Sequence, residues 1–147
     1  MYGAPFGLLA FGEEEPSGGT PPVTATVARP NADISAGGWV STRASLWDAI
    51  DEVTPDAADY ISTTSASACE IALSETAYPG AASQALIYDA SSVNGSTLTV
   101  TLKQGATTIA TWSHGLTPTL TTYRQTLTSG QIAALTSGLV SVTLAAS

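Results

Sequence analysis

One histidine and one cysteine are the side chains of this sequence best suited to acid–base or nucleophilic chemistry. His114 follows Ser113 at the expected end of a strand, and the sequence contains no G-x-S-x-G elbow that would supply a nucleophile beside it. Cys69 alternates with apolar residues and is expected on a buried strand face as an inert thiol. One imidazole and one thiol also fall short of the three or four ligands that zinc requires. We therefore predict no enzymatic activity and no cofactor.

A second candidate for chemistry is a group of carboxylates in the first half of the chain. Calcium binds several carboxylate and carbonyl oxygens, so a calcium site is one interpretation of this group. Helix capping and complementation of a helix dipole explain the same positions without a metal, and we predict no metal site. The group comprises Asp48, Asp51, Glu52, Asp56 and Asp59.

The charge balance narrows the choice of partners. The chain carries four basic and twelve acidic residues, a net charge of −8. It therefore lacks the basic contacts on which affinity for nucleic acid depends. No apolar stretch reaches the length of a membrane-spanning helix, and the N-terminus lacks the positive residues of a signal peptide. We expect neither nucleic acid nor membrane as a partner.

The first twelve residues form an apolar segment broken by glycine and proline. Its aromatic and aliphatic side chains are of the kind that bind a protein surface, which predicts a partner-binding arm. Residues 13–22 then combine acids, prolines and glycines, and are expected to form an extended tether. The predicted partner-binding side chains are Tyr2, Phe6, Leu8, Leu9 and Phe11.

From residue 60 onward the hydrophobic period is two, which predicts strands. Gly105 marks a tight hairpin between two of these strands, because glycine readily adopts positive φ. In the second strand of that hairpin the alternation slips between Ile109 and Trp112, and we favour a β-bulge that directs Trp112 inward over an outward-facing tryptophan. The predicted strands cover residues 69–74, 84–90, 96–103, 107–113, 121–128 and 139–145.

Earlier elements are shorter. A strand over residues 23–29 is expected to stop at Pro30, and a second extended piece surrounds Trp39. Ser45 and Asp48 fit a capping box that would begin a short helix ending near Val53. A second capping box is predicted over residues 128–131, before a one-turn helix over residues 132–135.

These elements predict an all-β fold with one or two short helices. Short antiparallel strands with one apolar face must bury that face on a second sheet, so we expect a β-sandwich over residues 23–147, preceded by the arm and tether of residues 1–22. A jelly-roll topology is our first expectation, and an immunoglobulin-like Greek key is the alternative, since periodicity does not fix strand order. Sandwich domains also bind sugars through exposed aromatic rings, for which Trp39 and Tyr78 are candidates.

Residues 29–63, 98–117 and 121–135 carry a pattern of tryptophan before an acidic helix, then D-Y-I, a glycine hairpin and T-x-Y-x-Q-T-L-T. This pattern resembles a β-sandwich module of tailed-bacteriophage proteins. The resemblance implies an accessory virion component, either a capsid cement (decoration) protein or part of a fibre. It implies no catalytic site, and residues 1–22 lie outside it.

The sequence and the resemblance together predict a structural protein on the outer surface of a phage capsid. Its arm would bind the major capsid protein, and its copies would form a homo-oligomer, with a trimer as one arrangement. The alternative is a fibre or head-fibre module that binds host-surface glycans.

Overall fold

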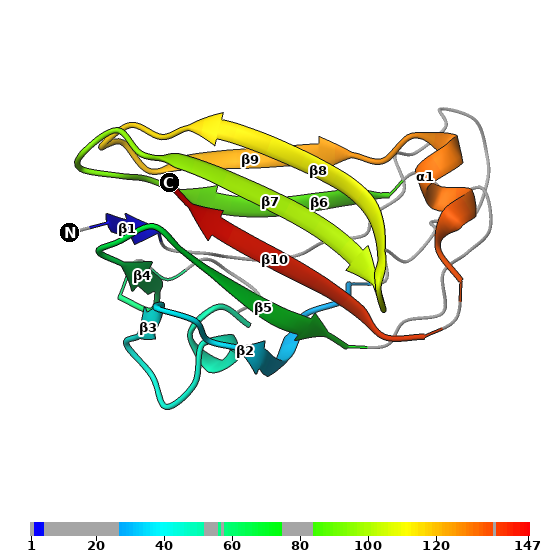
Figure 1. Ribbon diagram of the computed structural model, residues 1–147, viewed down its shortest axis with the longest axis horizontal. Helices are drawn as coiled ribbons and strands as arrows, with labels where there is room; N and C mark the ends of the chain where they lie inside the picture. The colour runs from blue at the N-terminus through cyan, green and yellow to red at the C-terminus, as the bar shows by residue number, and fades with distance from the viewer. Residues whose placement is uncertain (1, 5–26, 52–55, 57, 75–83, 137) are drawn as a thin grey trace, which may run out of the picture.

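The computed structural model describes residues 2–4, 27–51, 56, 58–74, 84–136 and 138–147 (Figure 1). These residues form ten strands, one 3₁₀ turn (η1) and one α-helix (α1). The strands are β1 (Tyr2–Ala4), β2 (Pro30–Ser35), β3 (Val40–Ser41), β4 (Ile61–Thr63), β5 (Ser67–Leu73), β6 (Ala85–Ala90), β7 (Thr97–Gln104), β8 (Thr107–Gly115), β9 (Thr121–Thr126) and β10 (Val140–Ala146). The helical elements are η1 (Trp47–Ala49) and α1 (Ser129–Ala134).

The strands form two layers. Within each sheet, all pairs of neighbouring strands are antiparallel. One layer is a five-stranded sheet in the order β2-β5-β10-β7-β8. Behind it lie the β6-β9 pair and the short β1-β4-β3 sheet (Figure 1). Between the layers is one apolar core, which includes Leu86 of β6, Val100 of β7 and Ile61 of β4. The predicted all-β sandwich is confirmed, and the chain changes layer from β5 to β6 and again from β6 to β7.

Strand β7 shows why the sequence folds this way. Its apolar residues alternate with threonines, and Leu98, Val100 and Leu102 are all buried. The turn into β8 joins Gln104 to Thr107 through two residues, and Gly105 has a φ of 56°. The hairpin predicted from this glycine is confirmed.

The predicted bulge in β8 is also present. The β7–β8 register shifts between Leu102, which faces Ala110, and Lys103, which faces Thr108, so that Ile109 is the extra residue. Ile109 and Ala110 are both buried as a result, and Trp112 packs partly buried against the core. A bulge thus allows residues at both odd-numbered and even-numbered positions of one strand to face the core.

The strand expected to end at Pro30 instead begins there. Residues 27–29 are not in a strand, although the backbone of Arg29 accepts a hydrogen bond from the Ser74 N–H at 2.7 Å. Strand β2 is an edge strand, where the missing N–H of Pro30 breaks no ladder. Pro30 is therefore the first residue of a strand and not the residue that ends one. The rest of the expected strand, residues 23–26, lies outside the described residues.

The helix expected from Ser45 to Val53 is reduced to the single turn η1 among the described residues. Its cap is also different, because the Asp33 carboxylate of β2 accepts hydrogen bonds from the N–H groups of Leu46 and Trp47 at 2.9 and 2.8 Å. The Ser45 capping box was therefore wrong. Its expected apolar face is correct, since Leu46, Ala49 and Ile50 are buried.

The second capping box is confirmed at the start of α1. Gln131 N–H donates to the Thr128 hydroxyl, and Thr128 N–H donates to the Gln131 side chain at 2.8 Å. The helix runs over Ser129–Ala134, so it begins three residues before the predicted start at residue 132 and ends one residue before the predicted end. Gln104 holds the following loop, since its amide donates to the Thr136 carbonyl at 2.6 Å.

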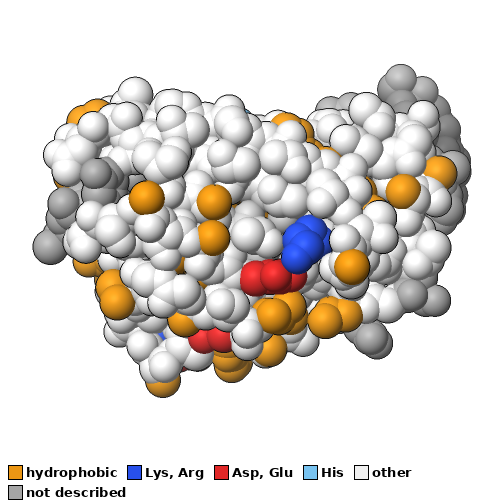
Figure 2. All heavy atoms as spheres, in the orientation of Figure 1, with side chains coloured by type: hydrophobic (Ala, Val, Ile, Leu, Met, Phe, Trp, Pro, Cys, Tyr) orange, Lys and Arg blue, Asp and Glu red, His pale blue; other side chains and the backbone are white. Residues whose placement is uncertain are grey.

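The outer face of the five-stranded sheet carries few charges (Figure 2). Hydroxyl side chains cover much of it, and pairs such as Thr99 and Ser113 contact one another across strands at 3.0 Å. Lys103 and Glu70 form an ion pair on this face at 3.1 Å, and Ser141 donates a hydrogen bond to Glu70. The charged and hydroxyl groups named here therefore satisfy one another's hydrogen-bonding capacity.

Candidate functional site

The N-terminal strand and the sheet edge that receives it are the candidate site. Strand β1 pairs with β4 so that Tyr2, Gly3 and Ala4 lie opposite Thr63, Ser62 and Ile61. Strand β3 occupies the other edge of β4. The start of the sequence-predicted arm is thus a strand of the protein's own second layer. We name the edge of β4 that pairs with β1 the acceptor edge.

The sequence of β4 explains how this strand is held in position. Ile61 and Thr63 are buried on the core side, while Ser62 between them is half-buried. The Thr63 hydroxyl accepts a hydrogen bond from the Ser65 N–H and donates to the Ser65 carbonyl, which forms a turn directly after the strand. Burial on one face and a hydroxyl turn at the end therefore hold β4 in place.

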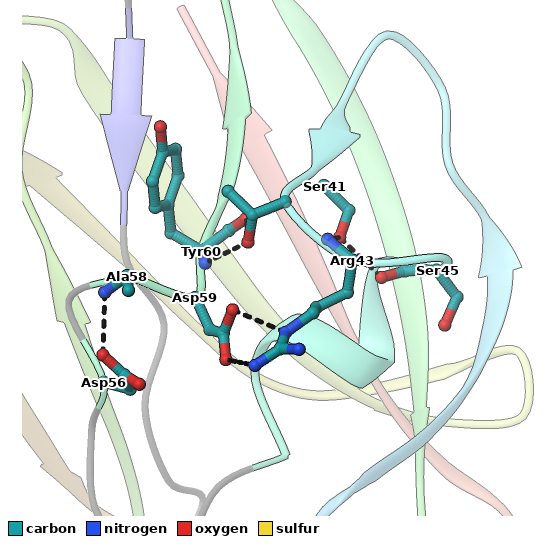
Figure 3. A network of polar contacts seen from close by, with 8 residues as sticks. Ser41, Arg43, Ser45, Asp56, Ala58, Asp59 and Tyr60 are labelled. Atoms are coloured by element: carbon teal, nitrogen blue, oxygen red, sulfur yellow. Dashed lines mark hydrogen bonds and ion pairs between the residues drawn. The ribbon is translucent and has the colours of Figure 1, made fainter.

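A polar network fixes the connection from β3 to β4 (Figure 3). Arg43 and Asp59 form a two-point ion pair, in which Arg43 Nε lies 2.6 Å from Asp59 Oδ1. Thr42 and Tyr60 exchange two further bonds: Thr42 N–H donates to the Tyr60 carbonyl, and Tyr60 N–H donates to the Thr42 hydroxyl at 3.0 Å. The residues that precede β4 are therefore tied to those that follow β3.

The same network accounts for part of the acidic group considered for calcium. Asp59 is engaged with Arg43, and the Asp56 carboxylate accepts a hydrogen bond from the Ala58 N–H at 2.8 Å. Over the residues that the structure describes, no three histidine, cysteine or acidic side chains are grouped so that they could hold a metal ion. The pairing of Asp59 with Arg43 gives that carboxylate a structural role.

The structure describes only one of the predicted partner-binding residues of the arm. Tyr2 lies in β1, whereas Phe6, Leu8, Leu9 and Phe11 fall outside the described residues. The sugar-binding candidate Tyr78 also falls outside them.

Trp39, the other sugar-binding candidate, is a core residue. Its side chain is only 5% exposed, and its Nε1–H donates to the Ser67 carbonyl at 3.3 Å. A ring that binds a sugar by stacking must expose one face, and the Trp39 ring does not. The structure thus argues against the expected glycan role of Trp39.

The glycines before Trp39 explain its burial. Gly37 has a φ of 55°, and a Cβ on it would lie 1.9 Å from the Ala68 carbonyl oxygen. Gly38 N–H donates to the Ser67 hydroxyl at 2.7 Å. The Gly-Gly-Trp segment is therefore a turn that contacts the start of β5 and inserts the indole beneath it.

The two reactive side chains are both structural. Cys69 is buried on β5, and burial raises the pKa of its thiol to about 12. His114 lies within β8, and not in the expected turn after it, with Nε2 at 2.6 Å from the Tyr88 hydroxyl and a ring contact to Tyr123. Burial lowers the pKa of His114, so the neutral imidazole is favoured.

The chain matches no protein-family model, no curated protein and no solved structure. Among the described residues no helix is both long and apolar enough to span a membrane.

Two features of this site were missed by sequence reasoning. The pairing of β1 with β4 joins segments about sixty residues apart, and residues 2–4 show no alternation that names a partner strand. The role of Asp33 as cap for η1 likewise depends on the placement of β2 beside that turn. The only available signal for Asp33 was its residue type, since a lone aspartate is a good cap for any nearby helix start.

Proposed function

We propose that this chain is a capsid cement protein of a tailed bacteriophage, which binds the major capsid protein on the outer surface of the head through its N-terminal segment. The observation that carries this proposal is the β1–β4 pairing. Residues 2–4 lie as an added strand on a sheet edge, which fits an N-terminal segment used for contacts. The resemblance of residues 29–135 to phage sandwich modules supports the virion setting.

In this proposal β1 anchors the start of the segment and the apolar residues after it supply the contact. Phe6 follows Ala4 by two residues in the sequence, and three more large apolar side chains follow by Phe11. Side chains of this type carry most of the binding free energy at protein interfaces. Each copy needs only a modest affinity, because many copies linked in an oligomer on one shell bind with high avidity.

The glycan-binding alternative has lost one of its two candidate side chains. Trp39 is buried, and its ring faces the core. The described residues thus give no specific support to a fibre or head-fibre module, and the cement role is the function we carry forward.

The test is co-sedimentation with undecorated shells of the phage that encodes the chain. One variant replaces Phe6, Leu8, Leu9 and Phe11 by serine and leaves β1 unchanged. We expect the wild-type chain to sediment with shells and this variant to remain in the supernatant, because its contact surface has become polar.

A matched control replaces Glu13, Glu14 and Glu15 by glutamine, which changes the tether but not the apolar residues. It should bind like the wild type. Circular dichroism of both variants should match the wild-type spectrum. If the serine variant still decorates shells, or if the wild type fails to do so, the cement proposal is wrong, and binding to a glycan array then becomes the test of the alternative.

A further inference from the structure

The acceptor edge holds a strand that is remote in sequence from the rest of the domain. Residues 5–29, twenty-five in all, separate Ala4 from the start of β2 at Pro30. The pairing itself involves three residues on each strand. A short strand on a long connection is the arrangement from which strands are exchanged between identical chains.

The second layer depends on β1 for its continuity. Among the described strands, β6 forms a ladder with β9 alone, and β4 forms ladders with β3 and β1. Strand β1 also approaches β6, so it lies between the two parts of this layer. Without a strand in that position, the acceptor edge would expose the backbone polar groups of β4.

The contacts that hold β1 do not depend on which copy supplies it. Backbone hydrogen bonds between Gly3 and Ser62 and their neighbours are the same whether the two strands belong to one chain or to two. Pairing within a chain and pairing between chains therefore have nearly equal contact energies, and proximity decides between them.

The length of the connection sets that proximity. A connection of this length gives a tethered strand an effective concentration on the order of millimolar, which falls as the connection lengthens. Fully extended, twenty-five residues span up to roughly 80 Å, enough to reach a neighbouring domain. Copies held side by side present one another's strands at comparable local concentrations.

We propose that β1 is an exchangeable strand and that the acceptor edge of β4 receives residues 2–4 of a neighbouring copy in the assembled oligomer. Each copy then gives its strand to one neighbour and receives a strand from a copy of the same chain, which links the domains through their second layers. This inference goes beyond the proposed function and does not depend on a capsid as the target.

The test uses the full chain with cysteines at the paired positions Gly3 and Ser62. A disulfide between them reports β1–β4 pairing, and its connectivity reports whether the pairing lies within or between chains. Equal amounts of ¹⁴N- and ¹⁵N-labelled G3C/S62C chains are unfolded, mixed, refolded together over a range of protein concentrations and oxidised. Non-reducing electrophoresis and mass spectrometry then count mixed-isotope cross-links.

The matched control is G3C/S129C, whose second cysteine lies on α1, at the opposite end of the molecule from β1 (Figure 1). Its cross-links measure random collisions. We expect mixed-isotope cross-links of G3C/S62C to rise with protein concentration and to exceed those of the control at least about fivefold. A product linked only within chains at every concentration, or an interchain yield no higher than that of the control, would overturn the proposal.

Discussion

The Tyr88 hydroxyl lies 2.6 Å from Nε2 of His114, so a strand from each layer of the sandwich contributes one partner to a polar contact between them. Tyr88 is buried on β6, and the ring of Tyr123 on β9 stacks on it at 5.5 Å. Gln125 Nε2 lies 3.3 Å from the same histidine nitrogen. An imidazole with its proton on Nδ1 accepts a hydrogen bond from the tyrosine, and a protonated imidazole cannot.

The burial of His114 should make the stability of the fold sensitive to acid. Burial lowers the pKa of His114 in the folded chain, so the unfolded chain takes up a proton at a higher pH than the folded chain does. The stabilising contribution is therefore fully present above the unfolded pKa of about 6.5 and decreases as the pH falls below it. We expect the urea midpoint to fall between pH 7.5 and pH 5.5.

His114→Gln isolates this contribution, because glutamine keeps an acceptor for Tyr88 but does not titrate. The difference between the urea midpoints of wild type and variant should change over this pH range, with the wild type losing more as the solution becomes acidic. A difference that stays constant with pH would show that the histidine does not govern the acid response.

Gly37 and Gly105 provide a matched pair, because both have a φ near 55° and only one is crowded. Gly105→Ala should lower the free energy of unfolding by about 1–2 kcal/mol, the usual cost of left-handed backbone for alanine. Gly37→Ala adds a collision with the Ala68 carbonyl, and should lower it by about 2–5 kcal/mol in total. Urea unfolding followed by tryptophan fluorescence measures both. Equal losses would contradict the close approach of this turn to β5.

Local patterns predicted most of the strands, because apolar and polar residues alternate with a period of two within each of these segments. The alternation in β7, the glycine hairpin and the capping box at Thr128 each depend on residues within a few positions of one another. The bulge at Ile109 was visible for the same reason, as a slip in parity within a single strand.

The features that were not predicted from the sequence depend on contacts between segments that are far apart along the chain. Ser45 has the composition of a cap, but the Asp33 carboxylate approaches from β2 and takes the two N–H groups of η1. Trp39 was considered as a surface ring because nothing beside it in sequence shows that β5 covers it. The β1–β4 pairing is of the same kind, since its two strands are separated by more than fifty residues of sequence.

The Cys69 thiol should be a probe of global unfolding. Its burial in β5 and a pKa of about 12 leave almost no accessible thiolate at pH 8, so a disulfide reagent should react only when the chain opens. Thr119→Cys adds an exposed thiol to the same molecule as an internal control. In native buffer we expect this second thiol to react at least about 100-fold faster than Cys69, and in urea the two rates should converge. Comparable rates in native buffer would show that β5 opens locally.

Asp33 should contribute to stability by capping η1. Asp33→Ala leaves the N–H groups of Leu46 and Trp47 without their carboxylate partner, and should lower the free energy of unfolding by about 1–2 kcal/mol. Asp33→Asn keeps one side-chain oxygen and should lose less. Thermal and urea unfolding of the two variants give this order, and the alanine variant should also shift the fluorescence of Trp47, which packs against the core beside the cap. If alanine and asparagine destabilise equally, or if neither does, the N–H groups of η1 do not depend on Asp33, and the reassignment of the cap from Ser45 to Asp33 fails.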